Sequence, residues 1–328
     1  MREDFCTFFA MDFDRIYAKS KQFLSLTSLY PVEFDRLLEV FRDRWYKFYK
    51  QYTLEGKRRK APYLKYRKDT PTLPRVEDKL FFVLIMLKNN TTQELIAASF
   101  ALDQSKASRR FDLLLPLLNE GLKKLGLQLA RNTEELQAQL RSKDQRPADD
   151  KVYLDASERP IGRVSDYEAQ KKDYSGKEHR HTVKNNLMCL SDQEVIYLGP
   201  TYRGAIHDKR MANLEGYTFD PELNLWRLED KGYDGLWVEG AHTMRPYTAR
   251  RNNPLTAIEQ EFNRWVSKQS ITIEHAISGI KRTKMAAQVY RLKNSARDQV
   301  MVACTALHNF RVRSPQRAYS PARAYVSA

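Results

Sequence analysis

Three separated stretches in the second half of the chain each run from apolar residues into a carboxylate. The first is VYLDASERP (152–160), in which Val152 and Leu154 alternate with Tyr153 and Asp155. This two-residue period predicts a strand that carries Asp155 at the edge of a buried sheet. A carboxylate in that position costs free energy unless a cation or hydrogen bonds neutralise it. We therefore expect Asp155 to share a site with other charged groups.

The two later stretches supply further acids. In LWRLEDKGY (225–233), apolar residues lead to Asp230 and the pattern breaks at Gly232. In ITIEHAISGIKR (271–282), isoleucines spaced for one helical face lie beside a polar stripe that contains Glu274. Two strand-end aspartates and a helical glutamate can converge on hard divalent cations, which prefer oxygen ligands. Two such ions about 3.5–4 Å apart catalyse phosphodiester chemistry. We predict that Asp155, Asp230 and Glu274 bind two Mg²⁺ or Mn²⁺ ions.

The charge balance indicates a polyanionic partner. The 328 residues include 56 Lys and Arg against 41 Asp and Glu, a net charge of +15. Nucleic acid is the commonest partner of such a surplus, although a ribosomal or otherwise generically basic protein fits as well. The length predicts two domains, or three.

No feature indicates export or membrane insertion. The three cysteines are far apart, without a disulfide framework or zinc spacing, which fits a reducing compartment. The longest apolar run, residues 81–87, is too short to span a bilayer. The first residues lack the order of a signal peptide. We expect a soluble cytoplasmic protein with no membrane partner.

The first half is predicted to be helical. Pro31 opens an amphipathic helix, so residues 1–54 are expected to form an N-terminal helical segment. Residues 55–75 combine many basic side chains with Tyr63, Tyr66 and several prolines. For this stretch, contact with the DNA backbone and a plain solvated linker are equally supported.

Residues 76–118 resemble a helix-turn-helix. One helix runs from Val76 to Lys88, and a capping box at Thr91 starts a second through Phe100. A third is expected to start at Ser105 and to end at Pro116, with a polar and basic outer face. The residues expected to share its opposite face are Ala107, Phe111, Leu114 and Leu118. In this pattern the second helix of the pair enters the major groove, although any three-helix bundle can imitate it. The predicted DNA-reading residues are Lys106, Ser108, Arg109 and Arg110.

The predicted secondary structure changes after a polar stretch at 142–150. Short strands and helices then alternate, which predicts a mixed α/β domain. Residues 235–252 are expected to be a loop, and Asn253 with Pro254 is expected to open a helix. The predicted division is a helical segment (1–54), a helix-turn-helix domain (55–141), a catalytic domain (151–311) and a disordered tail (312–328).

Several motifs occur together in the order of one protein family. They are YLDASERPIGR (153–163), YSGKEHRHTVKN (174–185), YLGPTYRGAIHDK (197–209), EDKGYDGL (229–236), IEHAISGIKR (273–282) and ALHNFR (306–311). With these motifs the second half resembles the DDE transposase domain of bacterial insertion sequences related to the PIF/Harbinger group. The helix-turn-helix resembles the region that accompanies this domain. Together the two resemblances cover roughly residues 31–311.

The resemblance implies an RNase-H-like fold and a metal-dependent DNA cutting and joining activity. Asp155, Asp230 and Glu274 match the three metal carboxylates of the family. Family members often carry an arginine four residues before the glutamate, whereas this chain has Ser270 there. A phosphate or orienting contact is then expected from one of the nearby cations Lys268, Lys281 and Arg282.

Other polar residues compete for roles near these acids. Glu158 is disfavoured as a ligand because it points to the opposite face of the strand from Asp155. Asp208 is best explained as a helix N-terminal residue, although it could lie near the site. For Lys177, Lys184 and the neighbouring histidines, DNA contact and a solvated strand face are equally supported. With Lys281 and Arg282, these two lysines complete the predicted DNA-binding set.

The expected function is therefore that of a DNA transposase. It would bind double-stranded DNA at the ends of its mobile element, hydrolyse the terminal phosphodiesters and join the 3′-hydroxyl to target DNA. A homodimer or higher oligomer is expected in the complex with both ends, associated with the bacterial nucleoid when bound. Two alternatives are a domesticated DNA-binding regulator without catalysis, and a nuclease that cuts without joining.

Overall fold

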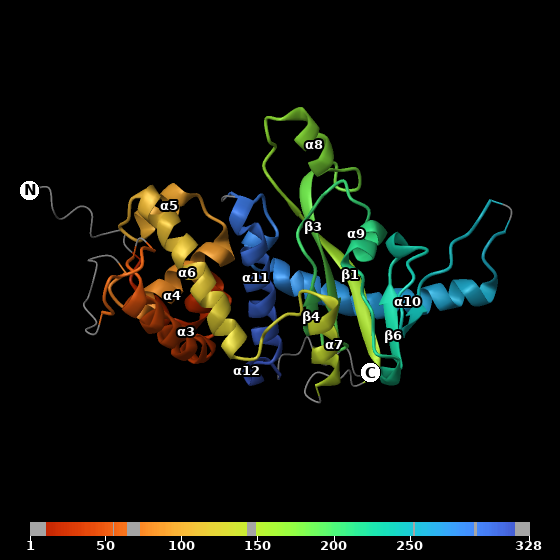
Figure 1. Cartoon of the computed structure of the whole chain (residues 1–328), viewed down its shortest axis with the longest axis horizontal. Coiled ribbons are helices and arrows are strands. Elements are labelled where there is room, and N and C mark those ends of the chain that lie inside the picture. The colour runs from red at the N-terminus through yellow and green to blue at the C-terminus, as the bar shows by residue number, and fades with distance from the viewer. Residues whose placement is uncertain are drawn as a thin grey trace, which may run out of the picture. The chain divides into compact units, whose positions relative to one another are not determined.

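The computed structural model describes residues 11–54, 56–63, 73–142, 149–251, 253–291 and 294–318. Its contacts divide the chain into two compact units. One, here called the helical unit, comprises residues 1–128 with 281–328, and the other, the sheet unit, comprises residues 129–280. Figure 1 shows the helices of the first and the strands of the second. Across the described ranges, no helix is both long enough and apolar enough to cross a membrane.

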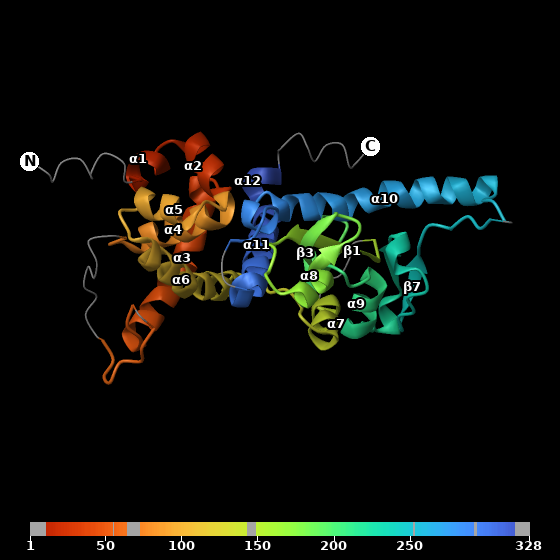
Figure 2. The same ribbon diagram turned by 90° about the horizontal axis from the view of Figure 1, so that it is seen from above.

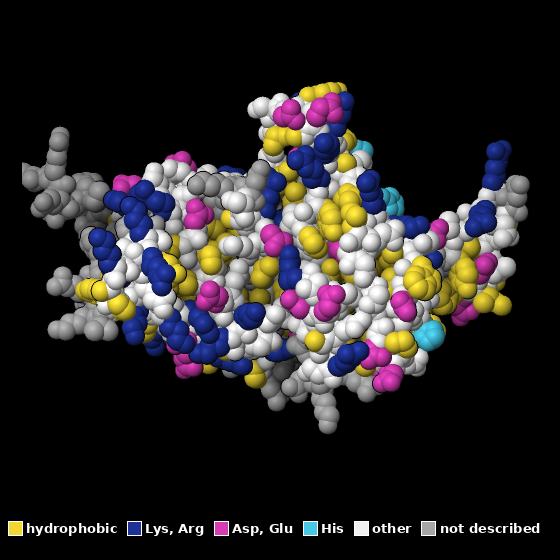
Figure 3. Space-filling model, viewed as in Figure 1, with side chains coloured by type: hydrophobic (Ala, Val, Ile, Leu, Met, Phe, Trp, Pro, Cys, Tyr) yellow, Lys and Arg dark blue, Asp and Glu magenta, His cyan; other side chains and the backbone are white. Residues whose placement is uncertain are grey.

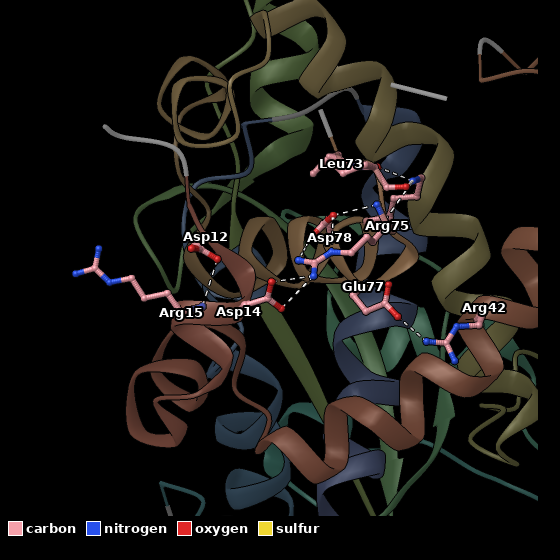
Figure 4. A network of polar contacts seen from close by, with 10 residues as sticks. Asp12, Asp14, Arg15, Arg42, Leu73, Arg75, Glu77 and Asp78 are labelled. Atoms are coloured by element: carbon pink, nitrogen blue, oxygen red, sulfur yellow. Dashed lines mark hydrogen bonds and ion pairs between the residues drawn. The ribbon is translucent and has the colours of Figure 1, made fainter. Parts of the chain in front are cut away.

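The helical unit begins with three helices, α1 (Phe13–Tyr17), α2 (Ser20–Thr27) and α3 (Pro31–Gln51). Pro31 occupies the first turn of α3, as predicted. Rings of the first helices stack on one another and on α4, for example Phe23 on Phe81 with centroids 5.7 Å apart. Arg75, just before α4, binds both Asp14 at 2.9 Å and Asp78 at 3.0 Å (Figure 4). The N-terminal segment therefore packs against the helix-turn-helix region within one unit.

The helix-turn-helix region contains α4 (Val76–Asn89), α5 (Gln93–Ser99) and α6 (Gln104–Lys124). The cap of α5 is Thr92, whose side chain accepts from the N–H of Leu95 at 3.3 Å, so the predicted cap at Thr91 was wrong by one residue. Asp103, and not Ser105, is the N-cap residue of α6.

Pro116 lies inside α6, so the prediction that it ends this helix was also wrong. A proline in a helix interior costs about 3 kcal/mol. The apolar face of α6 is buried over its whole length, and its packing outweighs that local cost. The residues predicted to share this face, Ala107, Phe111, Leu114 and Leu118, are all buried.

The chain returns to the helical unit at its C-terminal end. The long helix there is α11 (Arg297–Val312), preceded by two 3₁₀ turns, η3 (Lys284–Ala286) and η4 (Asn294–Ala296), and followed by α12 (Pro315–Ala318). It packs along α6, and the side-chain amide of Asn119 donates to the carbonyl of Gln299 at 3.1 Å. The sequence had placed residues up to 311 with the catalytic domain and residues 312–328 in a tail. Contacts group 281–318 with the helices, and residues 319–328 lie outside the described residues.

The sheet unit is built on a mixed sheet. Its main strands are β1 (Lys151–Pro160), β3 (Arg180–Cys189), β4 (Val195–Leu198), β6 (Leu225–Glu229) and β7 (Ala241–Met244), and two short strands, β2 (Tyr174–Ser175) and β5 (Tyr202–Arg203), also pair with β3. The main strands lie in the order β4–β3–β1–β6–β7. β1 is antiparallel to β3 and parallel to β6, and β6 is parallel to β7. This is an α/β fold of the RNase-H-like type, as expected.

One strand was missed in the sequence. β7 lies in residues 235–252, which were expected to be a loop. Its four residues are all exposed or half-buried, and they carry no clear alternation of apolar and polar side chains. It forms because its backbone pairs in parallel with β6.

Helices cover both faces of this sheet. α7 (Thr133–Arg141) and α9 (Asp208–Glu215) lie on one side, and α10 (Ala257–Lys281) lies on the other (Figure 2). Leu154 and Met188 belong to the core that includes Leu136 and Leu140 of α7. Tyr153, whose side chain alternates with that of Leu154, places its hydroxyl 3.5 Å from Gln269 of α10. Asp155 has the same parity as Tyr153, so it faces α10.

The helix α10 is one continuous element. Its predicted start at Asn253 and Pro254 was wrong, because the helix begins at Ala257. Thr256 and Glu259 form a reciprocal cap: Glu259 Oε2 accepts from the Thr256 N–H at 2.8 Å, and Thr256 Oγ1 accepts from the Glu259 N–H at 3.2 Å. The remaining helical pieces of the sheet unit are α8 (Tyr167–Asp173), η1 (Pro221–Leu223) and η2 (Lys231–Tyr233).

Candidate active site

Pairing between two parallel strands places two aspartates at the same level of the sheet. Asp230 follows the last residue of β6, as predicted, whereas Asp155 lies in the middle of β1 and not at its end, because β1 continues in its pairing with β3. In the pairing of β1 with β6, Leu154 is the partner of Glu229. Each of these two residues is followed by an aspartate, Asp155 and Asp230, so the two carboxylates lie at the same level, where the pairing of β1 with β6 ends. A cavity of about 190 Å³ opens there, and both aspartates line it.

The third predicted acid lines the same cavity. Glu274 reaches it from α10, together with Ser267, Ser270 and Ile273 of the same helix. Tyr153, Leu154, Leu228, Glu229 and Pro246 complete the lining. The structure therefore gathers Asp155, Asp230 and Glu274 around one space, from a strand, a strand end and a helix.

The electrostatics at Asp155 fit a cation. Desolvation by the surrounding atoms raises the pKa of Asp155 to about 6. The N–H of Ala156, which donates to Asp155 Oδ1 at 2.7 Å, and the charge of Lys177 oppose this shift. The negative charges of Asp230 and Asp208 add to it. An excess of carboxylate charge in a partly buried cavity is stabilised by a divalent cation.

The donor set has the chemistry of a Mg²⁺ or Mn²⁺ site but is open. One oxygen of each aspartate accepts a backbone N–H, Ala156 for Asp155 at 2.7 Å and Lys231 for Asp230 at 2.6 Å, which fixes its orientation. Within the described ranges, no three His, Cys, Asp or Glu side chains are close enough to enclose a metal ion. The three acids face a shared space rather than a single point, which suits ions that keep several waters.

An arginine pair braces the segment around Asp230. Arg245 Nη1 donates to Glu229 Oε1 at 3.0 Å, before Asp230, and to the carbonyl of Tyr233 at 2.6 Å, after it. The other oxygen of Glu229, Oε2, accepts from the buried Arg227 at 2.8 Å. Sequence reasoning missed Arg245, because it comes from the connection after β7, far from Asp230 in the chain. No feature of the sequence around Arg245 indicated its contacts with Glu229 and Tyr233.

Lys184 was predicted to contact DNA, but the structure places it inside the sheet unit. Its side chain is buried, and its ammonium binds Asp208 at 3.2 Å and Glu158 at 3.7 Å. Asp208 in turn packs against Gly232, where an added Cβ would lie 3.2 Å from Asp208 Oδ2. Lys184 therefore supports the second aspartate segment through Asp208. Glu158 points away from Asp155, as expected from its position in the strand.

The other predicted DNA-binding residues are more accessible. Lys106 and Arg109 are exposed on the first turns of α6, where Lys106 pairs with Asp103 at 2.7 Å. Ser108 is half-buried, and Arg110 donates to the carbonyl of Leu54 at 3.3 Å. Figure 3 shows Lys and Arg side chains over the visible face of the helical unit.

Lys177 is exposed beside β2 and acts electrostatically on Asp155. At the end of α10, Lys281 is half-buried and Arg282 is exposed, and both fall within the helical unit. Ser270, at the position where the family often has arginine, lines the cavity and donates to the carbonyl of Val266 at 3.1 Å. It contributes no positive charge, and Lys268, two residues earlier, is exposed.

Comparisons with known proteins match two regions of this chain. Residues 154–309 match the family model of the DDE superfamily endonuclease, and residues 72–124 match the helix-turn-helix of the DDE superfamily endonuclease. A probable transposase for insertion sequence element IS702 from Microchaete diplosiphon is 30% identical over 141 residues. That alignment covers 43% of this chain and 49% of the relative, so it spans about half of each. No solved structure matches.

Along the chain, the helix-turn-helix match precedes the endonuclease match. The helix-turn-helix match contains α4, α5 and α6, and the endonuclease match contains Asp155, Asp230 and Glu274. The chain therefore carries the helix-turn-helix and the endonuclease domain of the DDE superfamily endonucleases, in that order.

Proposed function

We propose that this protein is a DNA transposase that binds the ends of its mobile element, hydrolyses the terminal phosphodiesters and joins the freed 3′-hydroxyl to target DNA. The observation that carries the proposal is the shared level of Asp155 on β1 and Asp230 after β6, with Glu274 lining the same cavity. Acids arranged in this way suit phosphodiester chemistry at a divalent metal centre.

Two Mg²⁺ or Mn²⁺ ions held by Asp155, Asp230 and Glu274 would supply activation of the attacking oxygen and stabilisation of the leaving oxygen. The chain itself orients the acids: backbone N–H groups fix one oxygen of each aspartate, and Arg245 braces the segment on both sides of Asp230. In the first step a water oxygen attacks the phosphorus and the 3′-oxygen leaves with a proton. In the second step that 3′-hydroxyl loses its proton and its oxygen attacks a target phosphorus. A new phosphodiester forms, and the target strand's own 3′-oxygen leaves and takes up a proton. Neither step requires a Ser, Tyr or Cys nucleophile.

DNA recognition is assigned to the first turns of α6. In this proposal Lys106, Ser108, Arg109 and Arg110 contact the major groove of the element ends. Lys177, Lys281 and Arg282 contact phosphates, so the affinity falls steeply with salt. Two copies or more act together on the two ends, and the protein is associated with the nucleoid when bound.

A cleavage assay tests the proposal. DNA that carries the element's terminal and flanking sequence is incubated with Mg²⁺ and either the wild type, Asp155→Ala, or the control Glu222→Ala, which changes an exposed acid of the same unit. We expect cleavage and joined products with the wild type and the control, and neither with Asp155→Ala. Equal processing by Asp155→Ala would refute the site. Binding without processing by the wild type would favour a regulator, and cleavage without joined products would favour a nuclease.

A further inference from the structure

The apolar stripe of α10 extends beyond the part of the helix that is buried against the rest of the sheet unit. Val266, Ile273, Ala276 and Ile280 of this stripe are buried against the rest of the chain. The same stripe continues toward the N-terminal end of the helix with Ile258, Phe262 and Trp265. Ile258 is 80% exposed and Trp265 is 37% exposed. Figure 2 shows this half of α10 projecting past β7.

Three rings on this projection form a fixed row. The Tyr247 ring packs edge-on against Phe262 with centroids 5.3 Å apart, and Phe262 lies 6.0 Å from Trp265. The backbone of Tyr247 is tied to the helix by Asn263, whose side chain accepts from its N–H at 2.7 Å and donates to its carbonyl at 2.9 Å. Tyr247 is still 50% exposed. The rings are therefore held in place with their surfaces accessible.

The row leads to the catalytic cavity. Pro246, next to Tyr247, lines that cavity, and so do Ser267 and Ser270, within the turns that follow Trp265. The cavity holds about 190 Å³, less than the roughly 300–1,000 Å³ of small-molecule pockets. A space of this size accommodates a phosphate group of one strand. The bases of a strand that enters it must be accommodated outside.

Exposed cations lie on the same helix as Phe262 and Trp265. Between residues 241 and 273 the chain carries five Lys and Arg and two acids. One of these cations, Arg245, is already paired with Glu229 and Asp234. Arg264 and Lys268 are exposed on α10 beside Trp265. One of the two acids, Glu259, is engaged in the cap of the helix. Figure 3 shows hydrophobic side chains with Lys and Arg beside them on this projection. The charge favours a polyanion over a second copy of this basic chain.

We propose that Tyr247, Phe262 and Trp265 form a stacking platform for unpaired DNA bases, with Arg264 and Lys268 on the phosphates, and that it guides a single strand into the cavity. Aromatic rings combined with cations are the usual means of binding single strands, and each stacked base contributes about 1–3 kcal/mol. This inference deepens the proposed function, because it names the form of DNA that the site receives.

A binding experiment without metal separates the inference from catalysis. The probe is a fluorescein-labelled thymidine oligonucleotide, titrated with the full chain in EDTA. Trp265→Ala and Tyr247→Ala should each weaken binding by roughly tenfold or more. Trp265→Phe, which keeps a ring, should retain most of the affinity. The control Tyr167→Ala removes another exposed ring of the same unit and should change nothing.

The salt dependence distinguishes stacking from charge. Arg264→Gln with Lys268→Gln should reduce the slope of log affinity against log salt, because fewer phosphate charges are neutralised. The ring variants should weaken binding and leave that slope unchanged. Thermal unfolding of every variant shows whether the fold is intact, and Trp265→Phe provides the comparison if Trp265→Ala is unstable.

Two outcomes would overturn the platform. The first is wild-type affinity for the oligonucleotide in both ring variants. The second is a dimer that Ile258→Glu converts to a monomer in sedimentation, with oligonucleotide binding unaffected, which would make the projection a contact between copies. Either result leaves the proposed function standing if the wild type still cleaves element ends. If Asp155→Ala loses cleavage and binds the oligonucleotide normally, the result supports both the proposed function and the stacking platform.

Discussion

Leu154 of β1 and Glu229 of β6 are partners in a parallel pair, and each is followed directly by an aspartate. Parallel strands keep the same direction, so a single register brings both carboxylates to the same level, where the pairing of the two strands ends. A slip of one residue would turn one of them to the opposite face. The catalytic assignment depends on this register and on α10 lying on the face toward which Asp155 points.

The first prediction concerns Asp230. Asp230→Asn keeps the shape of the side chain and removes its charge. Mutation of a residue that only orients a metal ligand lowers metal affinity or activity by about 10–100-fold. Loss of a ligand itself should therefore reduce strand cleavage by more than about 100-fold. A cleavage assay over a range of Mg²⁺ concentrations measures this. Binding of duplex ends should persist, and cleavage at the wild-type rate would exclude Asp230 from the site.

The second prediction concerns Arg245 as a positioning residue. Arg245→Ala removes the donor to Glu229 Oε1 and to the Tyr233 carbonyl. We expect cleavage to fall about 10–100-fold and the Mg²⁺ requirement to rise, because Asp230 is less firmly oriented. Arg245→Lys should recover part of the loss. Arg141→Ala removes an exposed ion pair with Asp220 in the same unit and serves as the control. An unchanged Mg²⁺ requirement in Arg245→Ala would contradict this role.

The third prediction concerns the close approach of Asp208 to Gly232. A Cβ at Gly232 would lie 3.2 Å from Asp208 Oδ2, so Gly232→Ala should push the two apart by a few tenths of an ångström. Because a misplacement of 1 Å costs about 100-fold in activity, we expect a loss of up to about tenfold. The loss should be smaller when Asp208→Ala is also present. Gly176→Ala, where an added Cβ meets nothing within 4 Å, is the matched control. Equal losses in both backgrounds would rule out the steric explanation.

The fourth prediction is a pH effect on the helical unit. Burial by itself raises the pKa of Glu33, but hydrogen bonds from Arg317, Ser314 and the Tyr30 N–H outweigh it, so the pKa lies below its ordinary value. A depressed carboxyl pKa contributes stability above the unfolded value of about 4.5, and this is lost as the pH falls through the folded value. Glu33→Gln should lower the free energy of unfolding by about 3 kcal/mol at pH 7.

Urea unfolding at several pH values measures this effect. The difference between the wild type and Glu33→Gln should shrink as the pH is lowered from 5 toward 3, because protonation removes the same charge from the wild type. Glu39→Gln changes an exposed acid of the same helix and should have little effect at any pH. A difference that stays constant with pH would show that the ion pair with Arg317 does not contribute through its charge.

Much of the local structure could be predicted from the sequence because it depends on neighbouring residues. The alternation around Asp155 indicated a strand, and the isoleucine spacing indicated the helix that carries Glu274; both elements are present. The buried face of α6 was also predicted residue by residue. Errors occurred where packing outweighs local preference, as at Pro116 inside α6, and where a strand depends only on its partner, as in β7.

By itself, the sequence determined which residues carry charge at the ends of apolar elements, because period and composition are properties of adjacent positions. Only the tertiary structure decided how the strands and helices are aligned with one another. Strand pairing placed Asp155 level with Asp230, folding after β7 brought Arg245 to Glu229, and burial turned Lys184 from a surface cation into the partner of Asp208. These relationships join residues far apart in the chain, and their free energy comes from contacts that exist only once the sheet and its helices have assembled.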